Sequence, residues 1–244
     1  MNRLLVSKSD IGQVRQHNED HCWCGKNEKN NYMLIVCDGL GSYKGSKIAS
    51  EIVTRNFVNS FLKAEYKKIQ IKKWFLDVVE KSKTEFIQEI AKNEDYAKMS
   101  TTIVLSLIID ETAYTFWMGD SRAYIVKTNG SQLITRDHNL RNYLEDSNAS
   151  KIIFKKYEDN LDSITNFIDA TIKKETFGFE KVDIQSNDIL FLSSDGLYNF
   201  INMDLLYKYF KEENIEEGLD NIIKQVLKNG SDDNISFSAY ANFK

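Results

Sequence analysis

The stretch YMLIVCDGLGSYKG, residues 32–45, decides the fold, and two different structures are compatible with it. Its apolar run at 33–37 is typical of a buried strand, and the three glycines that follow lead into a segment with helical periodicity. Strand, glycine loop and helix in this order are typical of a dinucleotide-binding turn. However, Asp38 stands at the end of the strand, where a pyrophosphate would have to come close. The loop therefore holds either a nucleotide or a cation, and the remaining sequence has to distinguish the two.

Length and composition narrow the classes of protein. Of the 244 residues, 42% are hydrophobic, which is enough for a sizeable core in one large domain or two small ones. The formal net charge of −4 argues against broad binding to nucleic acid or to an anionic membrane. No apolar segment approaches the length of a membrane span, and MNRLLVSKSD has too short an apolar run for a secretory signal. Three cysteines without a regular framework favour a reducing compartment, so we expect a cytoplasmic protein.

Apolar spacing predicts an alternation of helices and strands along the whole chain. Residues 110–111 are a plausible turn, and we expect the strands between 102 and 135 to form one antiparallel meander. No linker or internal repeat divides the chain, so we expect one α+β domain over residues 1–244 with mainly antiparallel sheet. The predicted helices are 45–62, 74–91, 201–210 and 215–227, and the predicted strands are 33–37, 102–109, 113–118, 121–126, 132–135, 188–193 and 235–240.

One polar segment, residues 141–165, has no clear periodicity. We expect it to be a long surface excursion, which in a compact domain is usually functional or mobile.

Three aspartates share one local context. Asp38 and Asp195 each follow an apolar run and precede a glycine, and Asp233 stands just before the last predicted strand. If those strands are neighbours, the three carboxylates converge at one edge of a sheet, and like charges at close range stay ionised only when a cation pairs with them. Carboxylates without histidine or thiolate neighbours suit Mg²⁺ or Mn²⁺. One carboxylate can also bridge two such ions about 3.5–4 Å apart.

An Asp-Gly pair is also a common signal for a tight hairpin. That interpretation is weak for Asp38, because a glycine loop and a helix follow where a partner strand should be. It stays open for Asp195, because residues 197–200 could start either a helix or a strand.

The segment GQVRQHNED also has two interpretations. It supplies Glu19, Asp20 and Arg15, and an arginine fork matches phosphate oxygens bidentately. Taken alone, the simpler interpretation of this segment is a solvated charge run.

Three further features are ambiguous. The sequence GDSR predicts a tight turn with a local pair between Asp120 and Arg122, and the alternative is that Asp120 is a further metal ligand. His138, beyond a predicted strand, is expected to be a hydrogen-bonded turn residue. A structural zinc site is not expected, because zinc sites prefer spacings such as C-x₂-C, which are absent from the cluster His17, His21, Cys22 and Cys24. If that segment is extended, Asp20, Cys22 and Cys24 face one side, and His21 and Trp23 face the other.

These pieces occur together in one order, and the sequence resembles the metal-dependent serine/threonine protein phosphatases of type 2C, specifically a bacterial-type member. Each segment alone is weak, but seven in the same order are highly specific. The resemblance implies a four-layer αββα sandwich, in which helices flank two central antiparallel β-sheets. The seven segments are GQVRQHNED, IVCDGLGSYKGSKIAS, STTIVL, GDSRAYIV, LITRDHNL, LFLSSDGLYNF and GSDDNISF.

The resemblance also implies a metal centre with two ions, Mg²⁺ or Mn²⁺. By this likeness Asp38 bridges both ions, and the carbonyl of Gly39 binds one of them. Asp195 and Asp233 complete the inner shell, and Asp120 matches an aspartate that binds a third, weaker ion in bacterial members.

Around that centre the resemblance places Glu19 and Asp20, which would act mostly through metal-bound waters. Arg15 would hold the substrate phosphate. Residues 141–165 correspond to the flap, the family's most variable region.

The function implied is hydrolysis of phosphoserine and phosphothreonine monoesters in proteins. A water held between two divalent ions loses a proton near neutral pH, and the resulting metal-bound hydroxide attacks phosphorus in line. Arg15 and the ions neutralise the equatorial oxygens, so the catalytic residues are Arg15, Asp38, Asp195 and Asp233. The expected partner is a phosphorylated protein made by an opposing Ser/Thr kinase, and we expect a monomer that binds neither nucleic acid nor membrane.

The sequence departs from the family at three loop positions. Many members have histidine directly after the Asp-Gly, proposed as the acid that protonates the leaving serine oxygen, and this chain has Leu40. Bacterial members often read DGMGGH, and the last two positions here are Ser42 and Tyr43. A metal-bound water would serve as the acid, and Tyr43, with an unperturbed pKa of about 10, is the weaker candidate.

Two competing functions follow. The lost histidine positions suggest a catalytically weak or inactive relative that acts as a phosphoprotein-binding regulatory module. A dinucleotide-binding oxidoreductase requires a second strand after the first helix. Instead, helical spacing returns at 74–91.

Overall fold

The computed structural model describes residues 2–41, 43–63, 70–171 and 176–243; Ser42, one of the departing loop positions, lies outside them. The chain forms two five-stranded antiparallel sheets. Sheet I has the order β1 (Asn2–Asp10), β12 (Ile235–Phe243), β11 (Ile189–Ser193), β7 (Arg122–Lys127) and β8 (Gly130–Leu133). Sheet II has the order β10 (Gly178–Asp183), β6 (Thr112–Met118), β5 (Ile103–Ile109), β3 (Tyr32–Cys37) and β2 (His21–Lys26).

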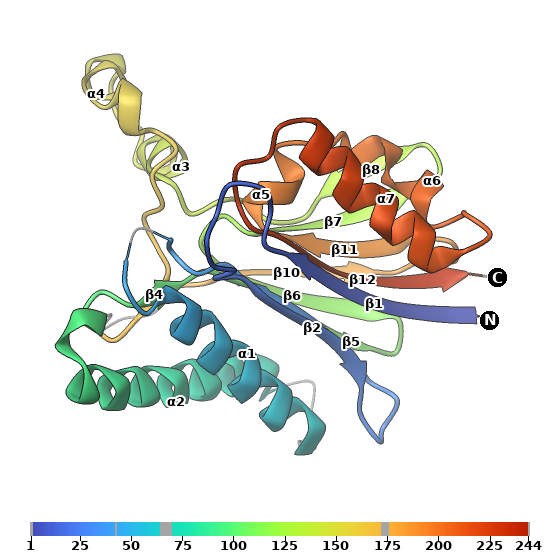
Figure 1. Cartoon of the computed structure of the whole chain (residues 1–244), viewed down its shortest axis with the longest axis horizontal. Helices are drawn as coiled ribbons and strands as arrows, with labels where there is room; N and C mark the ends of the chain where they lie inside the picture. Colours follow the sequence, from blue (N-terminus) through green and yellow to red (C-terminus); the bar gives the residue numbers. More distant parts are fainter. Residues whose placement is uncertain (1, 42, 64–69, 172–175, 244) are drawn as a thin grey trace.

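Helices cover the outer face of each sheet, so the molecule has the expected four αββα layers (Figure 1). Sheet II is covered by α1 (Ser46–Lys63) and α2 (Ile71–Lys92). Sheet I is covered by α5 (Asp195–Tyr198), α6 (Leu206–Tyr209) and α7 (Ile215–Lys228).

Three apolar interfaces hold the layers together. The interface between the two sheets contains buried residues from both, such as Leu34 and Val104 of sheet II and Leu190 and Leu192 of sheet I. The other two lie between each sheet and its helices. This explains why the central strands read as continuous apolar runs: they are buried on both faces.

Helix α7 shows how the sequence specifies an outer layer. The side chain of Asn214 accepts a hydrogen bond from the backbone N–H of Glu216, which caps the helix. Two acidic residues in the first turn interact favourably with the partial positive charge at the N-terminal end of the helix dipole. The buried residues Leu219, Ile222, Ile223 and Val226 recur at helical spacing and turn one stripe toward sheet I.

The predicted helices 45–62, 74–91 and 215–227 and the central strands are confirmed, whereas the predicted helix 201–210 is a 3-10 turn followed by the short α6. One connection is wrong. Strands β6 and β7 do not continue one meander, because β6 pairs with β5 and β10 in sheet II, whereas β7 pairs with β11 and β8 in sheet I. Residues 119–121 therefore carry the chain from one sheet to the other. Strands β1, β2 and β10 are not among the predicted strands. For β2, the expectation that alternate residues face opposite sides holds, because Cys22 and Cys24 pack on the inter-sheet core and Trp23 packs on the helix side.

The polar segment 141–165 is more regular than expected. It contains most of α3 (Leu140–Asp146), all of α4 (Lys151–Lys156) and the 3-10 turn η3 (Glu158–Asn160), and it projects from the body of the sandwich (Figure 1). Asn139 caps α3 by accepting from the N–H of Asn142, a local signal that the polar composition masked. The remaining short elements are η2 (Glu94–Tyr96), η4 (Met203–Leu205), and a two-stranded pair, β4 (Ser100–Thr101) with β9 (Ile168–Asp169).

The strand registers bring several chain reversals to one end of the sandwich. The start of β2 pairs with the end of β3, because His21 faces Cys37. The end of β11 lies beside both the first residues of β12 and the start of β7, because Ser193 faces Phe237 and Arg122. Polar residues at these strand ends are therefore neighbours in space.

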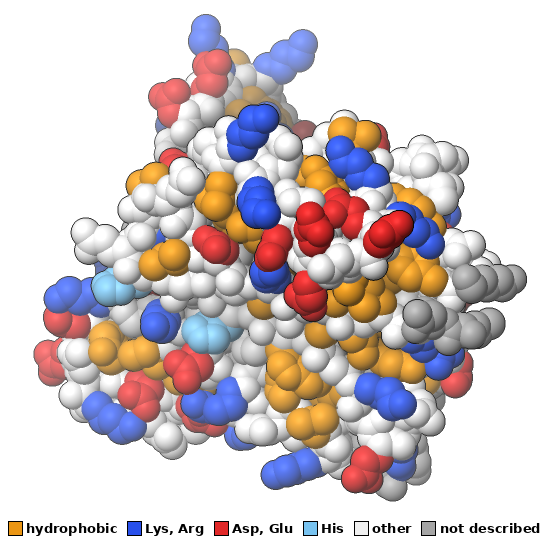
Figure 2. Space-filling model, turned by 45° about the vertical axis from the view of Figure 1, so that its right-hand side comes forward, with side chains coloured by type: hydrophobic (Ala, Val, Ile, Leu, Met, Phe, Trp, Pro, Cys, Tyr) orange, Lys and Arg blue, Asp and Glu red, His pale blue; other side chains and the backbone are white. Residues whose placement is uncertain are grey.

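None of the helices in the described ranges combines the length and the apolar character needed to cross a bilayer. On the face shown in Figure 2, basic and acidic side chains are interspersed among apolar ones, and a group of acidic side chains gathers near its upper centre.

Truncation of the inter-sheet core should destabilise the fold. Leu192 is fully buried, so Leu192→Ala is expected to lower the free energy of unfolding by about 2–5 kcal/mol, measured by urea denaturation. The matched control is Leu205→Ala at a side chain that is 51% exposed, which should change it by less than about 0.5 kcal/mol. Equal effects of the two substitutions would contradict the proposed core.

Candidate metal centre

Asp38 occupies a rigid backbone position at the end of β3. Its N–H donates to Oγ1 of Thr102 at 3.1 Å, and its carbonyl accepts from Oγ1 of Thr101 and from the N–H of Thr102, both at 2.8 Å. The backbone polar groups of Asp38 are thus satisfied by the start of the next strand. These bonds use only the backbone of Asp38, so they leave its carboxylate free of the neighbouring strand.

Gly39 is required by close approach of the chain. Its N–H donates to the carbonyl of Glu19 at 3.2 Å. A Cβ at this position would lie 2.7 Å from that carbonyl oxygen and 2.8 Å from the carbonyl oxygen of Ser46, distances that no side chain tolerates. The glycine therefore lets the strand end, the Glu19 segment and the start of α1 meet.

Asp195 begins a short helix, so the hairpin interpretation of its Asp-Gly pair is wrong. The chain runs from β11 directly into α5, and a Cβ at Gly196 would lie 2.1 Å from the carbonyl oxygen of Asn234. Just before it, the hydroxyl of Ser194 donates to Oδ2 of Asp20 at 2.7 Å. Asp20 is only 5% exposed. Because Asp20 precedes β2 and Ser194 follows β11, their hydrogen bond joins sheet II to sheet I.

Asp233 is held by donors on both oxygens. Oδ1 accepts from the N–H of Asn234 at 2.7 Å, and Oδ2 accepts from Nη2 of Arg15 at 2.7 Å. Nε of Arg15 also donates to the carbonyl of Asp232 at 3.3 Å. The GQVRQHNED segment is therefore part of the site rather than an isolated charge run.

Asn234 fixes that segment, and sequence reasoning missed it. Its Oδ1 accepts from the N–H of Glu19 at 2.9 Å, and its Nδ2 donates to the carbonyls of Ile11 and His17 at 2.8 and 3.0 Å. The signal that could have found it is the buried amide beside two aspartates in GSDDN, since a buried amide needs several backbone partners.

The carboxylates at this end of the sandwich repel one another. Burial is the main reason that the pKa of Asp20 rises to about 7, and the charges of Asp195 and Asp233 add to it. Burial raises the pKa of Asp195, and Asp233 adds to that too. Burial also raises the pKa of Asp38 well above its ordinary value, with further contributions from the four aspartates around it: Asp20, Asp195, Asp120 and Asp233.

Glu19 and Asp120 complete the acidic group. Burial raises the pKa of Glu19, although the charges of Arg15 and His17 oppose it. Burial raises the pKa of Asp120 to about 7, and the nearby charge of Asp195 contributes to the increase.

The donor set fits a hard divalent cation. All the acidic ligands predicted from the sequence gather at one end of the sandwich and offer only oxygens, and divalent charge would relieve the repulsion that raises their pKa values. In the described ranges, no three acidic, imidazole or thiol side chains are already arranged as a finished metal shell. The arrangement is therefore an acidic cluster that a cation would have to draw together.

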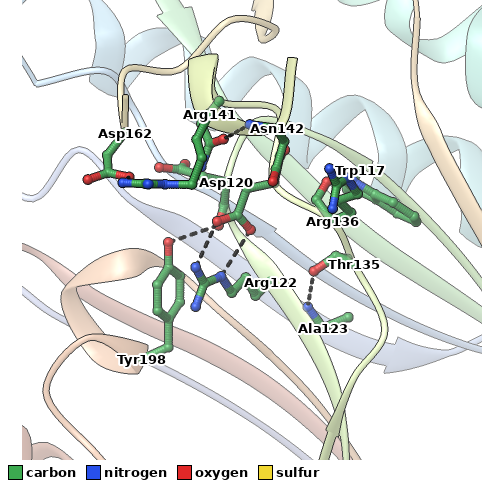
Figure 3. Close-up of polar contacts among 12 residues, drawn as sticks. Trp117, Asp120, Arg122, Ala123, Thr135, Arg136, Arg141, Asn142, Asp162 and Tyr198 are labelled. Carbon is green, nitrogen blue, oxygen red and sulfur yellow. Dashed lines mark hydrogen bonds and ion pairs between the residues drawn. The ribbon is translucent and has the colours of Figure 1, made fainter. Parts of the chain in front are cut away.

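Arg122 does not form the expected local pair with Asp120. It makes a bidentate ion pair with Asp137, with Nε and Nη2 at 2.9 and 2.7 Å from the two carboxylate oxygens. Its guanidinium also lies 4.0 Å from the ring centre of Tyr198, whose hydroxyl donates to the backbone carbonyl of Asp120 at 3.0 Å (Figure 3). The Asp120 carboxylate is thereby left without an ion-pair partner among the described residues, so its oxygens stay open to a cation.

The base of the projecting segment lies against this ion pair. Nδ2 of Asn142 donates to the carbonyl of Asp137 at 2.8 Å, and Arg141 pairs with Asp162 at 3.2 Å (Figure 3). Nδ1 of His138 accepts from the N–H of Gly119 at 3.3 Å, which confirms that this histidine is hydrogen-bonded, although it lies in an extended connection rather than a turn.

His21 bonds to Ser50 of α1, and burial raises the pKa of Cys22 to about 12, so both side chains are packed into the fold. The N–H of Leu40 donates to the carbonyl of Ser100 at 3.2 Å, and the Tyr43 side chain is 38% exposed at the rim.

Comparison with known proteins agrees with this geometry. The family described as Protein phosphatase 2C matches residues 12–235. A putative protein phosphatase of Mycoplasma genitalium is 35% identical, over 96% of this chain and 93% of its own. The crystal structure of serine/threonine phosphatase Stp1 from Staphylococcus aureus superposes with a TM-score of 0.84 at 26% identity, covering 99% of this chain and 95% of that one.

A third similar structure, at 20% identity and a TM-score of 0.78, covers 98% of this chain and 97% of its own. It is the catalytic domain of the serine/threonine protein phosphatase PstP in complex with two manganese ions. The fold and the acidic site define the class expected from the sequence, a protein phosphatase with an αββα sandwich. The chain belongs to the protein phosphatase 2C family.

The stability of the metal-free protein should fall as pH rises. Asp20 has a folded-state pKa of about 7 against an ordinary value of 3.8, so between these values the folded protein binds its proton more tightly than the unfolded chain. In EDTA the melting temperature is expected to be about 4 °C or more lower at pH 7.5 than at pH 5.5. Mn²⁺ should raise it at pH 7.5, and Asp20→Asn should flatten the pH dependence. Equal melting temperatures in EDTA at both pH values would contradict the repulsion.

Loss of the Asn234 amide should release residues 11–19. Asn234→Ala removes three hydrogen bonds, and we expect the free energy of unfolding to fall by about 2–3 kcal/mol. Hydrogen–deuterium exchange should accelerate in residues 11–19 more than in β1. The control Asn59→Ala, at an exposed position of α1, should change neither measurement. Unchanged exchange in 11–19 would show that the loop is held by other contacts.

Proposed function

We propose that the chain hydrolyses phosphoserine and phosphothreonine monoesters in proteins with the help of two divalent ions, Mg²⁺ or Mn²⁺. The observation that carries this proposal is the convergence of mutually repelling carboxylates beside an arginine at one end of the sandwich. The two manganese ions bound by the similar PstP domain support it. The inner ligands would be Asp38, the Gly39 carbonyl, Asp195 and Asp233, with Glu19 and Asp20 acting through water and Asp120 holding a third, weaker ion.

Bound ions would supply charge to the phosphate oxygens and lower the pKa of an attacking water. The chain's own part begins with Arg15. Its Nη2 is occupied by Asp233, whereas its Nη1 faces Gly41, where a Cβ would lie only 2.9 Å away. The glycine keeps that side of the guanidinium open, so Arg15 can orient a phosphate through its remaining N–H groups while Asp233 fixes its position.

The leaving serine or threonine oxygen needs a proton, and residue 40 offers no imidazole. Leu40 is apolar and Gly41 has no side chain. Among the described residues that follow in the loop, the first side chain with a proton to donate is the exposed phenol of Tyr43. We therefore propose that water in the site donates this proton, with Tyr43 as the weaker candidate.

We further propose that residues 1–244 act as one phosphatase domain and that residues 141–165 are its flap. The contact of Asn142 supports this, since it fixes the base of that segment to Asp137, the ion-pair partner of Arg122, while the Arg141–Asp162 pair closes the base of the segment on itself. A monomer that reverses the work of a Ser/Thr kinase in the cytoplasm is the simplest context for this activity.

Leu40 favours one alternative function. Without a histidine at that position, the chain would bind phosphoproteins through Arg15 and the ions yet turn them over weakly or not at all, as a regulatory module. The two functions differ only in turnover, so one set of assays distinguishes them.

Hydrolysis of a neutral phosphothreonine peptide should require both metal and Asp38. We expect turnover with Mn²⁺, none in EDTA, and a loss of more than about 100-fold in kcat/KM for Asp38→Asn, measured by phosphate release. Because Asp38→Asn also relieves repulsion, the same variant should melt at a higher temperature than the unmodified protein in EDTA. The control Asp77→Asn removes an exposed carboxylate of α2 and should change neither property.

Metal-independent turnover, or full activity of Asp38→Asn, would refute the proposed phosphatase. Tight metal-dependent binding of phosphopeptides without turnover would instead support the regulatory module.

A further inference from the structure

A pocket of about 600 Å³ lies beside the metal centre, between the Glu19 segment and the start of α1. Glu19 and Gly41 line it on one side, and Tyr43, Lys47 and Tyr96 are among the residues that line the rest. Glu19, Gly41 and Tyr43 belong to the proposed hydrolytic site, whereas Lys44, Lys47 and Tyr96 have no part in it.

The pocket adjoins the arginine assigned to the phosphate. A Cβ at Gly41 would lie 2.8 Å from Oε2 of Glu19 and 2.9 Å from Nη1 of Arg15, so this glycine is in contact with both side chains and with the pocket. His17, two residues after Arg15, also lines the pocket. A peptide whose phosphate is held by Arg15 therefore has neighbouring residues within reach of the pocket.

Two lysines, Lys44 and Lys47, stand in the wall of the pocket. Lys47 is exposed in the first turn of α1 and has no ion-pair partner among the residues that the structure describes. Lys44 also lines the pocket, where Asp95 holds it at 2.7 Å. A third lysine, Lys98, lies 5.6 Å from the ring centre of Tyr43. Glu19 is the one acidic side chain among the described lining residues.

The first turn of α1 adds to this positive character. It has no acidic residue, and the N-terminal end of a helix carries a partial positive charge. Lys47, placed in that turn, is therefore an unfavourable neighbour for the helix dipole and would be stabilised by an anion in the pocket.

We propose that this pocket is a specificity subsite for an anionic group of the substrate peptide, carried by a residue close to the phosphorylated one. The group is a carboxylate of Asp or Glu, or a second phosphate, and Lys47 is its principal partner. The enzyme then favours acidic or multiply phosphorylated segments. This inference rests on the proposed phosphatase function and names the substrate class that the site selects.

The test uses the full chain loaded with Mn²⁺ and phosphothreonine peptides that differ only in residues −3 to +3. One peptide series carries alanine at each position, a second places glutamate, a third places phosphoserine, and a fourth places lysine. We expect kcat/KM for the best glutamate or phosphoserine peptide to exceed that of the alanine peptide by about three- to tenfold, through a lower KM. The second and third series distinguish a carboxylate from a second phosphate.

Variants assign the preference to the pocket. Lys47→Ala should reduce the ratio of acidic to neutral peptide kcat/KM toward one, and Lys47→Glu should reverse it in favour of the lysine peptide. The matched control is Lys63→Ala, which removes an exposed lysine at the other end of the same helix and should preserve the ratio. A ratio that is unchanged by Lys47→Glu, or that is lost equally in Lys63→Ala, would overturn the subsite.

A second readout separates this inference from the phosphatase function. Fluorescence anisotropy with non-hydrolysable phosphonate versions of the alanine and glutamate peptides measures binding without turnover, and we expect tighter binding of the glutamate peptide that depends on Lys47. Hydrolysis of p-nitrophenyl phosphate reports the reaction without flanking residues. Hydrolysis without any acidic preference in rate or binding would overturn the subsite alone. Absence of all hydrolysis together with Lys47-dependent binding of the glutamate peptide would overturn the phosphatase function and leave the anion-binding pocket.

Discussion

The repulsion among carboxylates at one end of the sandwich is the constraint on which the rest of the site depends. Asp38 is surrounded by four other aspartates, and their proximity, together with burial, holds several of these groups at raised pKa values. Such a group is unfavourable unless protons or cations compensate it. The chain therefore gives up stability at this end of the molecule, and divalent cations would restore it. The feature that makes the metal-free site costly is thus the one that makes it fit for metals.

The sandwich tolerates this repulsion because its strand ends are held by other bonds. Backbone ladders fix β2, β3, β11 and β12 in register, and hydrogen bonds from neutral side chains join the two sheets where the acids meet. Ser194 bonds Asp20 across the sheets, and Asn234 ties residues 11–19 to the start of β12. These groups carry no charge themselves, so they hold the carboxylates in place without changing the net charge that a cation must balance.

Much of the fold followed from local pattern. The helices at α1, α2 and α7 and the buried strands β3, β5 and β11 agree with apolar spacing, because each buries a continuous face or run. Strand-end position also suggested that Asp38, Asp195 and Asp233 would converge. Local pattern failed where tertiary partners decide the outcome. β6 and β7 are close in sequence yet belong to different sheets, and Arg122 pairs with Asp137 rather than with its near neighbour Asp120.

The sequence by itself determined which segments are buried, where strands end, and that the acidic residues stand at those ends, because these properties depend on neighbours within a few residues. Only the tertiary structure decided that Asn234 would hold the Arg15 segment, that Gly41 would lie against Arg15, and that a pocket lined by Lys47 would open next to them. The physical reason is that a polar side chain takes as its partner whichever group the packing brings within hydrogen-bond distance. That group here is often more than 200 residues away along the chain.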